Sequence, residues 1–79
     1  MERAELISNL TAVFRKVFHN DSLNLTNELT ANDVDNWDSL THMRLITEIE
    51  NKFKIKFKLK ELNKMRNVGD MIDLILSKS

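Results

Sequence analysis

The 79-residue sequence contains no cysteine, no proline and a single glycine, Gly69. Without cysteine, the chain can form no disulfide, thiolate nucleophile or cysteine-ligated metal site. Proline and glycine are the residues that most often end helices, so their scarcity favours an all-α fold. A chain of this length buries only roughly 60% of its unfolded surface. We therefore predict a single domain, residues 1–79, with one small core and no catalytic site of its own.

Long apolar runs are also missing, and the net charge is zero. No segment is long enough to span a membrane and the first residues lack a signal-peptide pattern, so we expect a cytoplasmic protein without membrane contact.

The charge is unevenly spread. Residues 1–51 hold nine acidic and four basic side chains, whereas residues 52–66 hold seven basic and one acidic side chain. The chain is therefore an electric dipole rather than a uniformly charged body.

Apolar residues at helical spacing predict one helix over residues 3–18 and another over residues 39–53. The stripe of the first helix is Leu6, Ile7, Leu10, Val13, Phe14, Val17 and Phe18. In the second helix, Met43, Ile46, Ile49 and Phe53 are predicted to share the buried face, with Leu45 on its flank. The same rotation, roughly 100° per residue, points Leu40 away from that face into solvent.

Residues 20–37 are rich in Asn, Asp and Thr, which indicates a long loop, and Leu23, Leu25 and Leu29 are expected to pin it to the core. Residues 52–60 alternate lysine with apolar residues, as a half-buried strand does. Because no second strand is available to pair with it, we predict an extended connector at 54–58 that inserts Ile55 and Phe57 into the core.

A short helical turn is predicted at 59–65, followed by a last helix at 68–77. Asn67 and Asp70 resemble a capping box at the start of that helix. Its inward residues are predicted to be Val68, Met71, Ile72, Ile75 and Leu76. The expected fold is thus an all-α bundle of four helices, three longer and one short, with a long loop between the first two.

Asp38 and Ser39 stand where the long loop ends and the second helix begins. Asp38 is a good N-cap because its carboxylate can accept hydrogen bonds from free N–H groups of the first turn. A phosphate joined to the Ser39 hydroxyl would meet such N–H groups and the positive end of the helix dipole. Taken alone, the pair could be only a helix start. A second Asp-Ser-Leu, which contains Ser22, has no amphipathic helix after it.

The stretch Trp37-Asp38-Ser39-Leu40, followed by Met43, Leu45-Ile46, Ile49-Glu50 and Phe53, resembles the acyl carrier proteins. The resemblance extends over nearly the whole chain and implies a four-helix bundle whose interior can shelter a thioester-linked group. It implies that Ser39 carries a covalent 4′-phosphopantetheine arm, with Asp38 before it and Leu40 as an exposed partner contact. It also implies a non-enzymatic monomer served by a phosphopantetheinyl transferase and by acyl- or aminoacyl-loading and biosynthetic enzymes.

The partner-facing residues depart from the family pattern. The resemblance implies a family pattern in which carriers of fatty acid synthesis are strongly acidic along the serine helix and the short third helix. Here the outward face of the serine helix is predicted to be Thr41, Arg44, Glu48 and Asn51. Lys58, Lys60 and Lys64 follow in the next segment and are either partner contacts or a solvated face. We therefore expect a specialised stand-alone carrier for a dedicated pathway, such as that of a polyketide, a modified lipid, an amino acid or an envelope sugar.

A metal site and a nucleic-acid or anionic-surface site are the alternatives to the carrier hypothesis. His19 and His42 have no ligand partner at helical spacing, so no metal site is predicted. His42 is expected near the buried stripe, where it could line a pocket entrance, and Trp37 either covers core or lies over the start of the serine helix. Lysines interleaved with Phe53 and Phe57 suit a small nucleic-acid or anionic-surface binding module. Because those rings alternate away from the lysines, we prefer a protein without a nucleic-acid partner.

Overall fold

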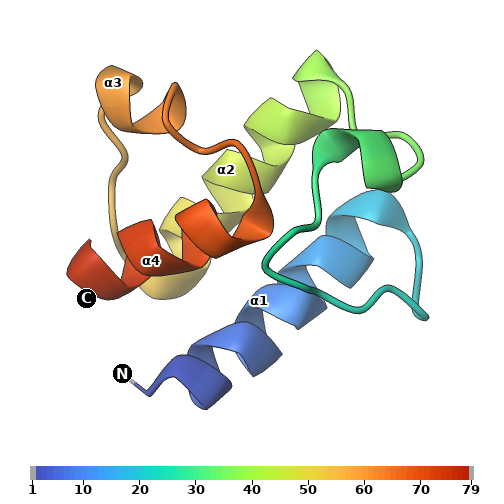
Figure 1. The fold of residues 1–79 in the computed structure, drawn as a ribbon, viewed down its shortest axis with the longest axis horizontal. Helices are drawn as coiled ribbons and strands as arrows, with labels where there is room; N and C mark the ends of the chain where they lie inside the picture. Colours follow the sequence, from blue (N-terminus) through green and yellow to red (C-terminus); the bar gives the residue numbers. More distant parts are fainter. Residues whose placement is uncertain (1, 79) are drawn as a thin grey trace.

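Helices account for most of the chain in the computed structural model, which describes residues 2–78. The elements in order are α1 (Arg3–Phe18), the 3-10 helix η1 (Ala31–Asp33), α2 (Ser39–Phe53), α3 (Leu59–Leu62) and α4 (Val68–Lys78). Figure 1 shows α1 running alongside α2 and below it, with α4 packed against α1, and the short α3 on the opposite side of the view from η1. The predicted arrangement of three longer helices, one short helix and a long first loop is confirmed.

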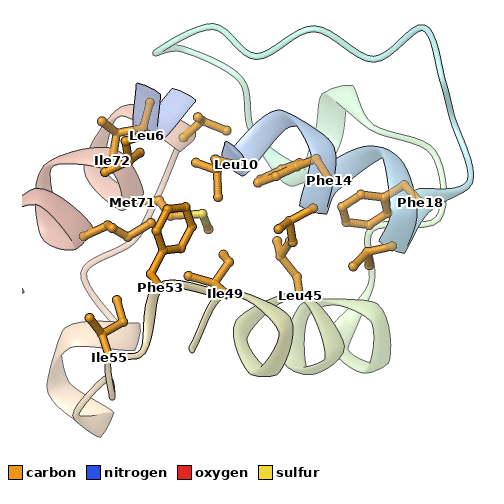
Figure 2. Close-up of a cluster of buried hydrophobic side chains, with 14 of the residues drawn as sticks. Leu6, Leu10, Phe14, Phe18, Leu45, Ile49, Phe53, Ile55, Met71 and Ile72 are labelled. Atoms are coloured by element: carbon orange, nitrogen blue, oxygen red, sulfur yellow. The ribbon is translucent and has the colours of Figure 1, made fainter. Parts of the chain in front are cut away.

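The core lies where α1 meets α2 and α4. Figure 2 shows the aromatic and aliphatic side chains of α1 pointing toward those of α2 and α4. The buried residues from these three helices are Leu6, Leu10, Val13, Phe14, Val17, Phe18, Leu45, Ile46, Ile49, Phe53, Val68, Met71, Ile72 and Ile75. An ion pair between Arg3 and Asp73 (3.2 Å) joins the starting turn of α1 to α4.

The expected buried face of α2 was wrong at two positions. Leu45 is fully buried rather than flanking, and Met43 is 56% exposed. Both follow from the packing of α1 against α2, which brings Phe14 and its neighbours to the side of the helix where Leu45 lies. The buried face is therefore Leu45, Ile46, Ile49 and Phe53.

The long loop contains one short element that the sequence interpretation did not separate. Thr30 caps η1: its backbone N–H donates to the Asp33 carboxylate (3.0 Å), and the Asp33 N–H bonds the Thr30 carbonyl. Val34, just after η1, is buried in the core. Leu23, Leu25 and Leu29 pack against the core as predicted. These contacts fix the path by which the loop reaches the start of α2.

The connector after α2 is extended and the strand-like pattern gives no strand, since residues 2–78 contain helices, turns and irregular segments only. Ile55 is buried and Phe57 packs against the core, as predicted. The predicted turn at 59–65 is shorter in the structure, where the helix ends at Leu62. The Asn67 side chain accepts from the Asp70 N–H (2.8 Å) to open α4, but the Asp70 carboxylate accepts from the Arg66 N–H instead of closing the capping box.

Two helices end without glycine, since His19 and Lys54 adopt the left-handed conformation (φ 53° and 57°) at the C-termini of α1 and α2. Such backbone costs a non-glycine residue on the order of 1 kcal/mol or more. We expect Lys54→Gly to raise the free energy of unfolding by about 0.5–1 kcal/mol, measured by urea denaturation. Lys56→Gly is the matched control: φ at Lys56 is not positive, so that change should lower stability. Equal effects of the two substitutions would contradict this account.

None of the helices in residues 2–78 is both long and apolar enough to cross a bilayer.

Candidate functional site

The start of α2 is fixed by a reciprocal cap between Asp38 and Thr41. The Asp38 Oδ1 accepts from the Thr41 N–H (3.0 Å), and the Thr41 Oγ1 accepts from the Asp38 N–H (2.8 Å). The Thr41 hydroxyl donates to the Asn36 carbonyl (2.6 Å). The backbone N–H of Thr41 holds the pKa of Asp38 below its usual value. Asp38 is therefore the N-cap, as predicted, and Ser39 is the first residue of the helix.

A tight turn brings the loop into this cap. Asn36 has φ 69°, a left-handed conformation that asparagine tolerates better than most residues. The Trp37 N–H reaches back to the Val34 carbonyl (3.4 Å), and the Asp38 N–H to the Asn36 carbonyl (3.2 Å). The turn reverses the chain between buried Val34 and α2, so the first residue of α2 is held by the loop as well as by the helix.

Ser39 is exposed at this fixed position. Within residues 2–78, its hydroxyl makes no hydrogen bond, so it is free to react with a partner. Ser22 is also exposed but lies in a turn of the long loop, and its backbone N–H bonds the Asn20 side chain (3.0 Å). Irregular backbone follows Ser22, whereas Ser39 is followed by α2. Of the two Asp-Ser-Leu serines, only Ser39 has the setting of a helix N-terminus.

Two hollows lie near the start of α2, and Ser39 lines the larger one. A surface groove of about 450 Å³ is lined by Ala31, Trp37, Asp38, Ser39, His42 and Met43. A smaller cavity of about 70 Å³ is lined by Ala31, Trp37, His42, Met65, Arg66, Asn67 and Met71. Ala31, Trp37 and His42 line both hollows, so they form the wall between the groove and the cavity. Met43, which the sequence interpretation had placed in the core, is part of the groove instead.

Trp37 and His42 are bonded to each other across the helix start. The Trp37 Nε1–H donates to the His42 Nδ1 (3.0 Å), and the two rings stack at 18°. The indole also meets Phe14 edge-on and Phe18 at a tilt, both at 5.5 Å between ring centroids. Trp37 thus covers core and borders the site at once, and His42 lies at the hollow as expected. No sequence signal predicted their hydrogen bond.

The outward face of α2 presents an unusual apolar side chain. Leu40 is 82% exposed, which confirms the sequence prediction of its exposure. Arg44, one turn further along, is exposed as well. Thr41 and Glu48 are half-buried rather than exposed, because Thr41 belongs to the cap and Glu48 pairs with Lys16 of α1 (3.1 Å). The face next to Ser39 is therefore Leu40 flanked by a cation.

The basic segment presents its charge to solvent. Lys58, Lys60 and Lys64 are exposed. The acid among them, Glu61, accepts from the Lys58 backbone N–H (2.7 Å) and from the Lys78 ammonium (2.9 Å), and these contacts lower its pKa. The negative charge of Glu61 is therefore shared between Lys78 of α4 and Lys58, and Lys60 and Lys64 extend the positive charge into solvent.

The alternative of a nucleic-acid binding module finds no support in the ring positions. Phe53 is buried and Phe57 packs against the core, so neither ring is presented for stacking on a base. Among residues 2–78, no cluster of three or more His, Cys, Asp or Glu side chains is placed to hold a metal ion.

Known proteins match this chain over most of its length. The phosphopantetheine attachment site family matches residues 8–75. The solution NMR structure of holo acyl carrier protein from Geobacter metallireducens is 54% identical in sequence, with a TM-score of 0.87 over 91% of this chain and 83% of that one. A comparison with curated protein sequences gives no match. The chain therefore belongs to the phosphopantetheine attachment site family, and it is a non-enzymatic carrier of the acyl carrier protein type that bears covalent 4′-phosphopantetheine.

Proposed function

We propose that Ser39 is the residue that bears the 4′-phosphopantetheine arm, and that the chain carries acyl or aminoacyl groups on it as thioesters. The observation that supports this most is the exposed Ser39 hydroxyl at the first residue of a capped helix. The arm supplies the thiol on which the thioester is formed. The protein itself holds Ser39 in a fixed position and presents it to partner enzymes.

The fit of a phosphodiester to this position rests on the helix. Negative charge near a helix N-terminus is stabilised by about 0.3–1 kcal/mol at an exposed site. The Asp38–Thr41 cap keeps the first turn ordered, so the anchor stays rigid while the arm moves. Ser39 has no base beside it within the described chain that activates it, so the attacking alkoxide is generated by the loading enzyme, a phosphopantetheinyl transferase.

The experiment that tests carriage has two stages. The unmodified chain is incubated with a broad-specificity phosphopantetheinyl transferase and coenzyme A, and then with an acyl donor. Intact mass should show one arm and then one acyl group, and hydroxylamine should remove the acyl group but not the arm. An acyl group that resists hydroxylamine would contradict a thioester carrier.

The surface charge supports a dedicated set of partner enzymes. Exposed Leu40 and Arg44 lie next to the anchor, and the exposed side chains of Lys58, Lys60 and Lys64 present positive charge to solvent. Charge complementarity between partners acts chiefly on specificity and association rate. The proposal is therefore that these five residues contact partner enzymes, and that the partners present acidic patches, in polyketide, modified-lipid or aminoacyl biosynthesis rather than in general fatty acid synthesis.

Leu40→Ala should slow loading of the arm several-fold because an exposed leucine beside the anchor can fill an apolar pocket on the transferase. The free energy of unfolding should change by no more than about 0.5 kcal/mol, since Leu40 makes little contact within the chain. Initial loading rates followed by mass spectrometry, together with thermal midpoints, measure both effects. Normal loading with a large loss of stability would show that Leu40 acts within the fold instead.

Reversal of Lys58, Lys60 and Lys64 to Glu should slow capture by the cognate partner enzyme. Added salt should shrink the difference from the parent, because exposed charges are screened over about 10 Å at 0.1 M ionic strength. The matched triple change to Gln removes charge without reversing it and should give an intermediate rate. If the Glu variant associates as fast as the parent at low salt, the lysines are only a solvated face.

The same proposal includes residues 1–79 acting as one carrier domain, monomeric and cytoplasmic. Light scattering of the loaded protein and fractionation of cells that express it test these points. A stable dimer, or recovery with membranes, would count against this part of the proposal.

A further inference from the structure

The wall between the groove at Ser39 and the inner cavity consists largely of two side chains. Trp37 comes from the end of the loop and His42 from the first turns of α2, and both line the two hollows. The third shared residue, Ala31, has too short a side chain to close the passage alone. The Trp37–His42 pair therefore lies between the groove and the cavity.

Only one form of His42 can make the observed bond. An indole Nε1–H is a donor only, so the Nδ1 atom that accepts it at 3.0 Å must carry a lone pair. The imidazole is then neutral, with its proton on Nε2. A second proton would go to Nδ1, and both rings would then direct an N–H at the same point. Protonation of His42 therefore breaks the bond that joins Trp37 to α2.

Burial is what opposes that protonation. Burial of the ring lowers the pKa of His42. Arg66, from the segment before α4, lines the same cavity and brings a positive charge, while Asp38 at the groove brings a negative one. Ala31 of η1 and Met71 of α4 bring no charge, and neither do Phe14 and Phe18, the α1 rings that contact Trp37. The closed pair is thus the resting state near neutral pH.

Trp37 is also the member of the pair that can move. It follows the turn at Asn36, and its backbone N–H makes a long hydrogen bond (3.4 Å) to Val34. His42, in contrast, is inside α2, and its N–H bonds the Asp38 carbonyl at 2.8 Å. Loss of the side-chain bond would leave the indole held only by its ring contacts with Phe14 and Phe18.

We propose that the Trp37–His42 hydrogen bond is a latch between the groove at Ser39 and the cavity lined by Met65 and Met71, and that its release admits the group tethered beside it. The second half of this inference rests on attachment at Ser39. The methionine lining suits an apolar acyl group, because methionine side chains adapt their shape to what they contact. Release follows from protonation of His42 or from any partner group that takes the place of Nδ1 as acceptor.

The first test uses the unmodified chain, in which Trp37 is the single tryptophan. Its emission should change on acidification, with a midpoint below the usual histidine pKa of 6.5, while helicity by circular dichroism is retained. His42→Gln should abolish the step, because an amide oxygen accepts from the indole without titrating. His19→Gln, a change at the other histidine, should leave the step in place. An unchanged step in His42→Gln, or loss of helicity together with the emission change, would overturn the latch.

Helicity is measured in parallel because His42 also links folding to pH. Its pKa is lower in the folded chain than in the unfolded one, so the unfolded chain binds the proton more readily. Its contribution to stability is therefore fully present above the unfolded pKa and falls as the pH drops toward the folded pKa. The latch step must be seen while the chain is still folded.

The second test uses the acyl-loaded chain at neutral pH and measures hydroxylamine cleavage of the thioester. His42→Ala removes the latch, so the acyl group should enter the cavity and be cleaved several-fold more slowly than in the parent. His42→Gln should match the parent. Equal rates in all three proteins would overturn admission of the group. If the chain accepts no arm at Ser39, the carrier proposal fails. The tryptophan titration still tests the latch in that case, because it uses the unmodified chain.

Discussion

Ser39→Ala should abolish attachment of the 4′-phosphopantetheine arm, and Ser22→Ala should be loaded as fast as the parent. Both serines are exposed and both lie in Asp-Ser-Leu. Only Ser39 combines a free hydroxyl with a capped helix start and the exposed Leu40 beside it. Intact mass after treatment with the transferase and coenzyme A measures the result. The expected loss in the Ser39 variant is complete, because no other atom at that position can form the phosphodiester.

The loss should be chemical rather than structural. Alanine is the best helix former, and the cap between Asp38 and Thr41 does not use the Ser39 side chain. Circular dichroism and the thermal midpoint of Ser39→Ala should therefore stay near the parent values. Appearance of one arm on Ser39→Ala, or its loss from Ser22→Ala, would contradict the assignment.

Leu45→Ala should remove a large part of the stability of this domain. Leu45 is fully buried on α2 against α1, and truncation of a buried leucine costs about 2–5 kcal/mol. A domain of this size is stable by only about 5–15 kcal/mol. Urea denaturation followed by circular dichroism should therefore show a much lower midpoint than in the parent.

Leu40→Ala is the matched control, since it makes the same chemical change on the same helix. Leu40 is 82% exposed, so its truncation should change the free energy of unfolding by no more than about 0.5 kcal/mol. The contrast between the two leucines tests the rotation of α2 directly. Similar losses in both variants would mean that α2 is turned differently from the structure described above.

The helices were predictable because their apolar residues recur at a period close to that of the α-helix. The bounds of residues 3–18 and 39–53 match α1 and α2. Periodicity gives the direction of the buried face only within about one residue, and this explains the exchange of Met43 and Leu45. The sequence cannot tell on which side of α2 the first helix will pack. That choice puts Leu45 inside and leaves Met43 at the groove.

The sequence holds one local signal for η1 and none for the Trp37–His42 hydrogen bond. Thr30 and Asp33 have the spacing of a capping box, which would have predicted η1 within the long loop. The Trp37–His42 bond, by contrast, has no signature, because it joins a loop side chain to a helix side chain through tertiary packing. The anchor itself was predicted: Asp38 as cap and Ser39 as first helical residue depend only on neighbours along the chain.

The measurement that tests the central claim most directly is the location of the arm on the loaded, unaltered protein. Trypsin cannot decide it, because no Lys or Arg lies between Lys16 and Arg44, and both serines remain in one peptide. Cleavage on the N-terminal side of aspartate separates them, since the peptide that begins at Asp38 contains Ser39 but not Ser22. The carrier assignment predicts the mass of one arm on that peptide alone. An arm on the peptide that contains Ser22, or on neither, would contradict it.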